Sequence, residues 1–318
     1  MQPTVFAESV LGDGRRLQIV RATEADAPAL TGVILDAFRH RPTVDPPPAA
    51  LTETPDGVRA ALAAGFGVLA LVDDEPAGAL IVSIDGATAG IHRVSVRPTF
   101  QRHGVASAMV EVVLEALSVR KVRRVELVAR AEFPAVVAWW QRHGFEEVAR
   151  TGSSLRLARE LPLCVRAATA EDTHNLGRRL ATVLRAGDLI IASGELGAGK
   201  TTLTQGIGAG LNVAGPVISP TFVLSRVHPS LGGGPDLVHV DAYRLGSAAE
   251  LDDLDLDASV SESVTLVEWG TGIAEGLSAD RLEIDIRRSL DPGDETRWIF
   301  VTGVGPRWRG VLASLEES

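Results

Sequence analysis

The chain has 318 residues, 45% of them hydrophobic and 23% charged, which is enough for two folded domains and excludes a chain that is disordered by composition. Its net charge is −10, and residues 161–318 carry most of it, with 13 basic and 22 acidic residues against 18 and 19 in residues 1–160. An acidic second half is a poor footprint for direct binding of DNA or RNA. The single cysteine, Cys164, excludes an intrachain disulfide and a multi-cysteine zinc site.

Two rare residue types restrict where chemistry can occur. The sequence has one tyrosine, Tyr243, and two lysines, Lys121 and Lys200. No apolar run reaches the roughly 18 residues that a membrane span needs. The first residues also lack the basic-then-apolar profile of a secretory signal. We therefore expect a cytoplasmic protein that has no membrane partner.

Residues 17–160 predict a mixed α/β domain. Thr23 is the expected N-cap of the first helix, with Asp26 three residues later, and Thr54-Pro55 begins a second helix. The segment Asp73-Asp74-Glu75-Pro76 separates two apolar runs and is the expected hairpin turn. Apolar runs and helical spacing predict strands at 17–21, 66–72, 77–84, 91–96, 122–128 and from 145 onward, and helices at 27–38, 105–117 and 134–142.

A short glycine motif joins the strand that ends at residue 96 to the following helix. Gln101, Gly104 and Ala106 form Q-x-x-G-x-A, in which small residues let main-chain N–H groups approach a pyrophosphate. Gly144-Phe145 then follows the last helix. With the order of strands and helices, these two motifs resemble a GNAT-type acetyltransferase over residues 17–160. The resemblance implies acetyl-CoA, with its pyrophosphate on residues 102–106 and its pantetheine arm along 94–96, held by Val94, Val96, Arg102, Gly104, Val105 and Ala106.

The catalytic part of this resemblance is weaker. Many family members have a tyrosine four residues before that glycine, as general acid for the leaving thiolate, and here the position is Trp140. Phe133 replaces an asparagine that is common earlier in the same helix. Glu132 and His92 are candidate bases, although a lone histidine is more often a surface or packing residue. The acyl acceptor, and whether the domain transfers acetyl groups at all, stay open.

The expected domain boundary lies near residues 160–163, which gives domains at 1–161 and 162–318. The charge balance changes there, and a new strand-to-helix unit begins. Cys164 to Arg166 is the expected strand, Thr169 the helix cap, and residues 176–184 the helix.

A phosphate-binding loop follows in this second domain. Residues 189–193 form an apolar strand, residues 203–211 predict a helix, and the segment between them contains G-x-x-x-x-G-K-T. The glycines let main-chain N–H groups surround phosphate oxygens, Lys200 supplies positive charge, and Thr201 supplies an oxygen ligand for Mg²⁺. The predicted ATP contacts are Gly194, Glu195, Leu196, Gly197, Ala198, Gly199, Lys200, Thr201 and Thr202.

Two carboxylates stand at the ends of later apolar strands. Asp241 follows residues 237–240 and Glu268 follows residues 264–267. A lone aspartate at a strand end more often caps a turn. Two carboxylates downstream of a phosphate loop favour function, because parallel strands bring such residues to one crevice.

Four motifs in order resemble the TsaE (YjeE) family over residues 164–305: residues 194–202, Ser219-Pro-Thr-Phe222, His239-Val-Asp-Ala-Tyr-Arg244 and Val267-Glu-Trp269. That family is the ATPase component of threonylcarbamoyladenosine synthesis on tRNA, so the resemblance implies slow ATP hydrolysis, a TsaB–TsaD partner assembly and only indirect contact with tRNA. Thr201 and Glu268 would hold Mg²⁺, and residues 219–222 would respond to the nucleotide. We assign charge neutralisation to Lys200 and orientation of water to Asp241. Tyr243 and Arg244 have no decided role.

The expected fold class is therefore α/β, with a GNAT-like mixed sheet and flanking helices followed by a P-loop NTPase-type domain. Rival functions are a nucleotide-dependent binding switch, and an acetyltransferase with a regulatory nucleotide-binding domain. P-loop kinase chemistry is disfavoured because no arginine-rich lid is evident. The acidic run at residues 250–257 is either a solvated face or a docking surface for a basic partner.

Overall fold

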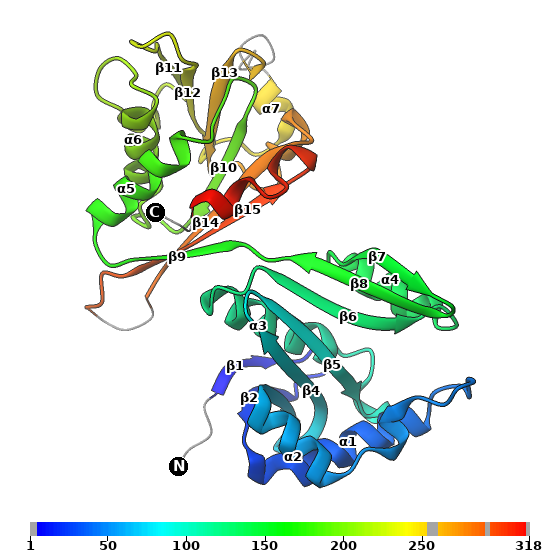
Figure 1. The fold of residues 1–318 in the computed structure, drawn as a ribbon. Helices are drawn as coiled ribbons and strands as arrows, with labels where there is room; N and C mark the ends of the chain where they lie inside the picture. Colours follow the sequence, from blue (N-terminus) through cyan, green and yellow to red (C-terminus); the bar gives the residue numbers. More distant parts are fainter. Residues whose placement is uncertain (1–4, 253–259, 290–292, 316–318) are drawn as a thin grey trace. The chain divides into compact units, whose positions relative to one another are not determined.

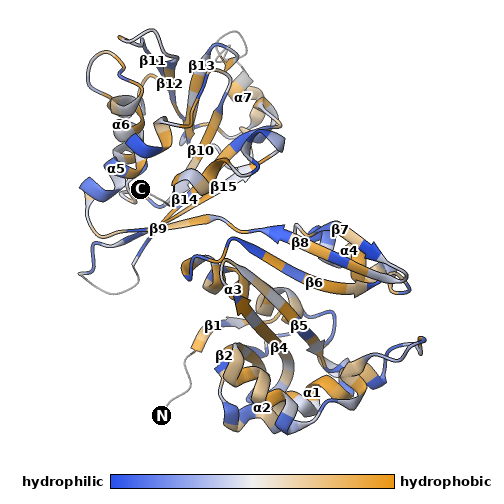
Figure 2. Cartoon of the chain, viewed as in Figure 1, coloured by the Kyte–Doolittle hydropathy of each residue, from blue (hydrophilic) through white to orange (hydrophobic). Residues whose placement is uncertain are grey.

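Hydrophobic strands build two separate sheets in this chain. The computed structural model describes residues 5–252, 260–289 and 293–315. The chain divides into two units, Met1–Leu161 and Pro162–Ser318, with an eight-stranded sheet in the first and a seven-stranded sheet in the second (Figure 1). The apolar residues concentrate in the strands and on the helix faces that cover them (Figure 2). No helix among the described residues is long and apolar enough to cross a membrane.

The sheet of the first unit has the strand order β1-β2-β3-β4-β5-β6-β8-β7. Its elements are β1 (Val5–Val10), β2 (Arg16–Ala22), α1 (Ala27–Arg39), α2 (Pro55–Ala64), β3 (Phe66–Val72), β4 (Glu75–Asp85), β5 (Thr88–Val96), α3 (Val105–Val119), β6 (Arg124–Arg130), α4 (Pro134–Arg142), β7 (Glu146–Thr151) and β8 (Ser154–Glu160). Leu80 and Val82 of β4 pack with α3 on one face, and Ala79 and Ile81 pack with α1 and α2 on the other. Both faces of the sheet are therefore covered.

The only parallel pair in this sheet, among its described strands, is β5 with β6. These two strands share three register pairs, in which Thr88, Ala89 and Gly90 face Arg124, Val125 and Glu126. Both strands continue beyond this point without pairing to each other. The sheet therefore opens between the later parts of β5 and β6.

The hairpin between β3 and β4 is tighter than the sequence predicts. Asp73 and Asp74 alone form the turn, with φ angles of 48° and 68°. Glu75 and Pro76, which we expected in the turn, pair with Val72 and Leu71. The expected helix cap at Thr54 is confirmed, because its Oγ1 accepts the N–H of Gly57 at 3.1 Å. Strands β1 and β8 were not predicted as separate elements.

The sheet of the second unit has the order β11-β12-β13-β10-β14-β15-β9, in which β12, β13, β10 and β14 are parallel. Its elements are β9 (Leu163–Ala167), α5 (Ala170–Ala181), β10 (Leu189–Gly194), α6 (Lys200–Gly210), β11 (Ser225–His228), β12 (Asp236–Asp241), α7 (Ala248–Asp252), β13 (Ser263–Glu268), β14 (Arg281–Arg288) and β15 (Arg297–Val304). Residues 253–257 of the acidic run lie outside the described residues.

Two helices of this unit start earlier than predicted. The first begins at Ala170, because Thr169 and Asp172 cap it reciprocally through N–H···O bonds of 2.9 and 3.1 Å. It ends at Ala181, before the predicted residue 184. Helix α6 begins at Lys200, directly after the glycine loop. The two helices touch through glycines: a Cβ on Gly206 would lie 2.0 Å from the carbonyl oxygen of His174. This close contact packs α6 directly against α5.

Candidate nucleotide site and acyl-carrier cavity

The loop between β10 and α6 has the backbone that phosphate binding requires. Gly194, Gly197 and Gly199 have φ angles of 138°, 76° and 113°, a region that side chains other than glycine rarely adopt. A Cβ on Gly194 would lie 2.4 Å from the carbonyl oxygen of Ile286. The loop ends at the N-terminus of α6, whose first N–H groups have no partner within the helix. Together these donors form a site for an anion.

Lys200 lies folded back into this loop. Its Nζ donates to the carbonyl oxygens of Gly194 and Glu195 at 2.8 and 3.1 Å. It also lies 3.8 Å from the ring centroid of Trp269. Burial lowers the pKa of the Lys200 ammonium, against the opposing charges of Glu268 and Asp241. The ammonium therefore lies beside the loop, bonded to two neutral carbonyl oxygens and the Trp269 ring.

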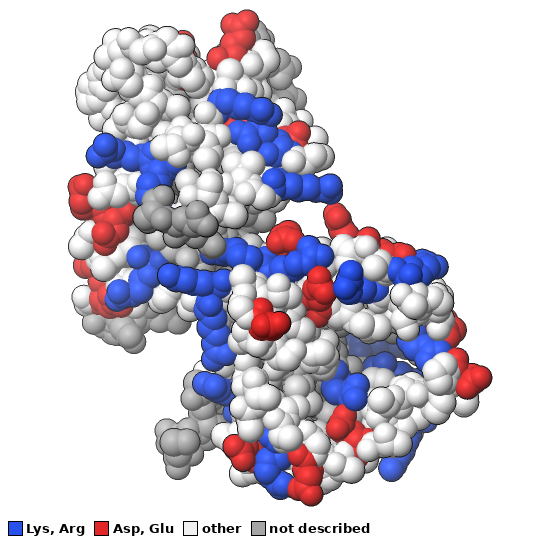
Figure 3. All heavy atoms as spheres, in the orientation of Figure 1, with Lys and Arg blue, Asp and Glu red and all other residues white. Residues whose placement is uncertain are grey.

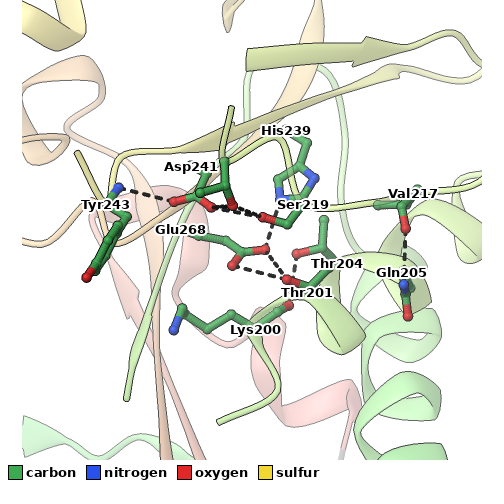
Figure 4. A network of polar contacts seen from close by, with 11 residues as sticks. Lys200, Thr201, Thr204, Gln205, Val217, Ser219, His239, Asp241, Tyr243 and Glu268 are labelled. Carbon is green, nitrogen blue, oxygen red and sulfur yellow. Dashed lines mark hydrogen bonds and ion pairs between the residues drawn. The ribbon is translucent and has the colours of Figure 1, made fainter. Parts of the chain in front are cut away.

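Glu268, at the end of β13, accepts hydrogen bonds from two side chains near the first turn of α6 (Figure 4). Thr201 Oγ1 donates to Glu268 Oε1 at 3.0 Å, and His239 Nε2 lies 2.9 Å from the same oxygen. An ionised carboxylate can only accept, so His239 carries its proton on Nε2. His239 is fully buried and Glu268 is 3% exposed. The carboxylate is held in one orientation beside the threonine hydroxyl.

Asp241 ends the neighbouring strand, β12, and pairs in register with Glu268. The expected meeting of the two carboxylates at one edge of the sheet is therefore confirmed. Asp241 Oδ2 accepts the hydroxyls of Ser219 and Thr221 at 2.9 and 2.7 Å, and Oδ1 accepts the N–H of Tyr243 at 3.1 Å. Asp241 thus holds the loop at residues 219–221 against the strand ends.

Tyr243 and Arg244 make ring contacts at the rim of this site. The Tyr243 ring meets the Trp269 ring edge-on, with centroids 5.3 Å apart. The Arg244 guanidinium lies 5.4 Å from the ring centroid of Phe222. Arg244 forms no ion pair with the described residues, and Phe222 is 87% exposed. Among the described residues, the partner of the Arg244 guanidinium is therefore the Phe222 ring.

The oxygen atoms present fit a magnesium ion that is shared with a nucleotide. Thr201 and Glu268 bring a hydroxyl and a carboxylate together, and both are oxygen donors of the kind that Mg²⁺ prefers. The described residues contain no group of three or more His, Cys, Asp or Glu side chains that could hold a metal alone. Phosphate and water oxygens would have to complete the coordination, as is usual for Mg²⁺ at nucleotides.

The first unit contains a cavity of about 1430 Å³ where β5 and β6 separate. Four of the six predicted acyl-carrier residues line it: Val94, Val96, Arg102 and Ala106. The other two, Gly104 and Val105, do not. Gly104, with φ of 84°, caps the N-terminus of α3, and the Val105 side chain packs in the core. If Gly104 and Val105 contribute to binding the acyl carrier, they would do so through their main-chain atoms.

Strand β5 bulges along the wall of this cavity. Ser95 pairs with Ala79 and His92 pairs with Ile81, so β5 has an extra residue over this interval, and Arg93 has a φ of 54°. A bulge of this kind takes main-chain groups out of the ladder. The wall therefore presents backbone hydrogen-bonding groups beside Val94.

The residues considered for catalysis in this unit differ in their surroundings. Trp140 is 5% exposed and its ring lies 4.9 Å from that of Phe145, so it is a core residue at the cavity wall. Arg130 lowers the pKa of Glu132 to about 2 by hydrogen bonding, which makes that carboxylate a poor base. His92 lines the cavity, bonds Ser83 Oγ at 2.8 Å, and has its pKa lowered by desolvation and by Arg93. Of the two bases, His92 has the better environment.

The strand, glycine loop, helix and paired carboxylates of the second unit define a P-loop nucleotide-binding protein. A family model described as threonylcarbamoyl adenosine biosynthesis protein TsaE matches residues 167–297, and one described as acetyltransferase (GNAT) family matches residues 35–145. The chain belongs to the TsaE family. Its first unit is a GNAT-like domain.

Individual proteins match each half. The TsaE protein of Streptomyces coelicolor is 64% identical over 137 residues, which are 42% of this chain and 93% of that protein. The crystal structure of Bacillus subtilis YdiB is 34% identical, covers 49% of this chain and 94% of its own, and has a TM-score of 0.40. The PaiA N-acetyltransferase of Thermoplasma acidophilum, solved with coenzyme A, is 11% identical over 45% of this chain and 98% of its own, with a TM-score of 0.42.

Two residues of the nucleotide site had no role in the sequence-based prediction. His239 orients Glu268, and Trp269 lies against Lys200. The role of His239 was indicated by strand alternation, because His239 lies two residues before Asp241 and so on the same face of β12. No pattern indicated the second, since Trp269 reaches Lys200 only after a turn with φ of 62°.

Proposed function

We propose that the second unit binds and slowly hydrolyses Mg²⁺–ATP in support of threonylcarbamoyladenosine modification of tRNA. The observation that carries this proposal is the network of Thr201, Glu268 and His239 beside the glycine loop. The network places a hydroxyl and an oriented carboxylate at the helix N-terminus where phosphates would bind. The family name and the relative from S. coelicolor support the biological role.

Each residue of this site would have a separate task. The loop N–H groups would bind the β-phosphate region, and Lys200 would supply positive charge to the terminal phosphates. Thr201 and Glu268 would hold Mg²⁺, which when bound neutralises developing charge on phosphate oxygens. Asp241 would orient the attacking water. Because Asp241 also holds Ser219 and Thr221, the loop at residues 219–221 would respond to the state of the nucleotide.

A TsaB–TsaD assembly is the proposed partner, with tRNA contacted only through it, in the cytoplasm. The test is to purify the full chain with TsaB and TsaD and to measure complex formation with ATP, with ADP and without nucleotide. We expect ATP-dependent assembly that Lys200→Gln abolishes. Lys121→Gln is the matched control, because Lys121 is the only other lysine and lies in the first unit. Equal assembly in all three nucleotide states would refute the proposal.

Turnover separates this proposal from a pure binding switch. If hydrolysis only resets the complex, Glu268→Ala should block ATP hydrolysis while one round of modification still occurs. If modification needs continuous hydrolysis, Glu268→Ala and Lys200→Ala should abolish it equally. The readout is modified tRNA per complex, measured alongside phosphate release.

For the first unit we propose binding of acetyl-CoA and transfer of its acetyl group. The cavity, the bulge at Arg93 and the exposed N-terminus of α3 support this proposal. Arg102 would bind the pyrophosphate, and Val94 and Val96 would contact the pantetheine arm. His92 would accept the proton of the acceptor. Isothermal titration of the full chain with acetyl-CoA is the test, and absence of binding would also remove the rival in which acetyl transfer is the principal activity.

A further inference from the structure

The cavity of the first unit contains an arginine that has no counter-ion among the described residues. Five arginines line this cavity: Arg41, Arg93, Arg102, Arg130 and Arg156. Three of them have acidic partners. Arg93 pairs with Glu53 at 2.6 Å, Arg130 with Glu132 at 2.5 Å, and Arg156 with Glu126 at 4.0 Å.

Of the other two, only Arg41 is substantially buried. Arg102 is exposed, and the proposed acetyl-CoA site already uses it. Arg41 forms no ion pair with any carboxylate in the part of the chain that the structure describes. Burial lowers the pKa of its guanidinium, and no neighbouring acid opposes this effect. Figure 3 shows basic atoms in the hollow that the cavity forms on the viewed face of this unit.

The contacts of Arg41 hold its guanidinium in place but leave most of its donors unused. The group lies 3.9 Å from the ring centroid of Phe38, and Nη2 donates to the carbonyl oxygen of Val94 at 3.3 Å. A guanidinium has five N–H donors in a planar fork that matches a carboxylate. A charge that is partly desolvated without a partner is costly in free energy. A bound anion would relieve that cost.

The position of Arg41 relates this anion to the proposed transfer reaction. Val94 belongs to the stretch of β5 along which the pantetheine arm would lie, so an anion on Arg41 would lie beside the acyl end of the carrier. The cavity, at about 1430 Å³, exceeds the roughly 300–1,000 Å³ of a pocket for one small ligand, so it has room for an acceptor beside that arm.

We propose that Arg41 binds the carboxylate of the acyl acceptor, and that the acceptor is a small amine carrying a carboxylate, of the free amino acid class. This inference rests on the proposed acetyl transfer. The amine nitrogen attacks the thioester carbonyl carbon, and a C–N bond forms as the C–S bond breaks. The nitrogen gives its proton to His92, and coenzyme A leaves as a thiolate that takes a proton from solvent. The products are an N-acetylated acid and free coenzyme A.

The test compares acids with their carboxamides. The full chain is incubated with acetyl-CoA and each L-amino acid, or the matching amino-acid amide, and thiol release is followed with a chromogenic disulfide. The only thiol of the chain, Cys164, is buried, so the background is low. We expect at least one acid to be used with a kcat/KM about tenfold or more above that of its amide, because a charged hydrogen-bonded pair is lost with the amide.

Variants assign the preference to Arg41. Arg41→Gln should lower kcat/KM for the acid by about 10- to 100-fold, mainly through KM, and leave the amide unchanged. For the acid, the kcat/KM of Arg41→Lys should lie between that of the parent chain and that of Arg41→Gln, because lysine keeps the charge and loses the planar fork. Arg39→Gln is the matched control, since Arg39 is the exposed last residue of α1, two positions before Arg41, and does not line the cavity. Thermal unfolding of each variant verifies that the fold is intact.

Titration with acetyl-CoA separates the two levels of the proposal. If the parent chain does not bind acetyl-CoA, both the transfer function and the acceptor class are wrong. If it binds acetyl-CoA, the acceptor class alone is overturned by equal use of acid and amide, by use of no amino acid, or by an unchanged KM in Arg41→Gln.

Discussion

The two units hold their polar site residues in opposite ways. In the second unit Lys200, Asp241 and Glu268 are 3–5% exposed, and each has at least two partners within 3.1 Å. In the first unit the site is a wide cavity, and among the described residues Arg41 contacts only the Val94 carbonyl oxygen and the Phe38 ring. A site whose groups are already mutually bonded is preorganised for one ligand. A buried charge without an opposite charge nearby indicates the charge of the ligand that the site would bind.

The same contrast applies to ion pairs, and it predicts the largest effect on stability. Asp188 and Arg307 form a buried bidentate pair in the second unit, with distances of 3.1 and 2.9 Å. Asp188→Asn should reduce the free energy of unfolding of this unit by about 3–5 kcal/mol, because it leaves the Arg307 charge buried without its partner. Urea unfolding monitored by tryptophan fluorescence measures this change in the free energy of unfolding.

The matched control lies in the first unit. Glu147 and Arg150 form an exposed pair at 2.8 Å. Glu147→Gln should leave the urea midpoint close to that of the parent chain, because solvent screens an exposed pair. Similar effects of Asp188→Asn and Glu147→Gln on stability would show that burial does not decide how much an ion pair contributes here.

The next largest effect is on ATP hydrolysis. Glu268→Gln keeps the shape of the side chain and removes its negative charge, so hydrolysis should fall by about 100-fold or more. His239 acts through Glu268, as a positioning residue. His239→Leu should raise the Mg²⁺ concentration for half-maximal hydrolysis by about tenfold, while His239→Gln, which retains an N–H donor, should restore part of the loss. An unchanged Mg²⁺ requirement in His239→Leu would show that the hydrogen bond has only a structural role.

A smaller effect concerns the backbone of the phosphate loop. Gly194→Ala should destabilise the second unit by about 1–3 kcal/mol, because its φ of 138° is strained for alanine and the new Cβ would contact the Ile286 carbonyl. Gly276→Ala is the control, since a Cβ there meets nothing within 4 Å. Equal midpoints of thermal unfolding for the two variants would contradict the steric argument.

The smallest expected effect is the acid sensitivity of the second unit. His228 is 3% exposed, and burial lowers its pKa below the ordinary 6.5. The unfolded chain therefore binds this proton at a higher pH than the folded unit does. Stability should be full above about pH 6.5 and should decline as the pH falls below it. Urea midpoints between pH 7.5 and 5.5 should show a flatter decline in His228→Asn, and parallel curves would exclude His228 as the cause.

The parts of this protein that the sequence predicted well are those where function demands a fixed local pattern. The glycine loop needs left-handed backbone at Gly197 and Gly199, so its residues identify it without any tertiary information. The meeting of Asp241 and Glu268 was also predictable, because parallel strands end at one edge of a sheet. Helix starts at capping residues such as Thr54 and Thr169 were similarly local.

The parts that were missed depend on contacts between distant segments. The β14–β15 hairpin was missed although Leu282, Ile284 and Ile286 alternate with polar residues as in a half-buried strand. Strand β1 is mostly exposed, so its pattern is weak, and it forms by pairing with β2. Whether Asp241 is free or holds Ser219 and Thr221 depends on how a loop 20 residues earlier folds back.

The sequence by itself determined the two classes of domain, the residues of the phosphate loop and the identity of the two strand-end carboxylates, because each is a local pattern with a chemical reason. Only the tertiary structure decided which charges are compensated. Arg93 and Arg130 have acidic partners, and Arg41, in the same cavity, has none among the residues that the structure describes. Pairing of charges depends on which side chains the fold brings within a few ångströms, and spacing along a chain does not encode that distance.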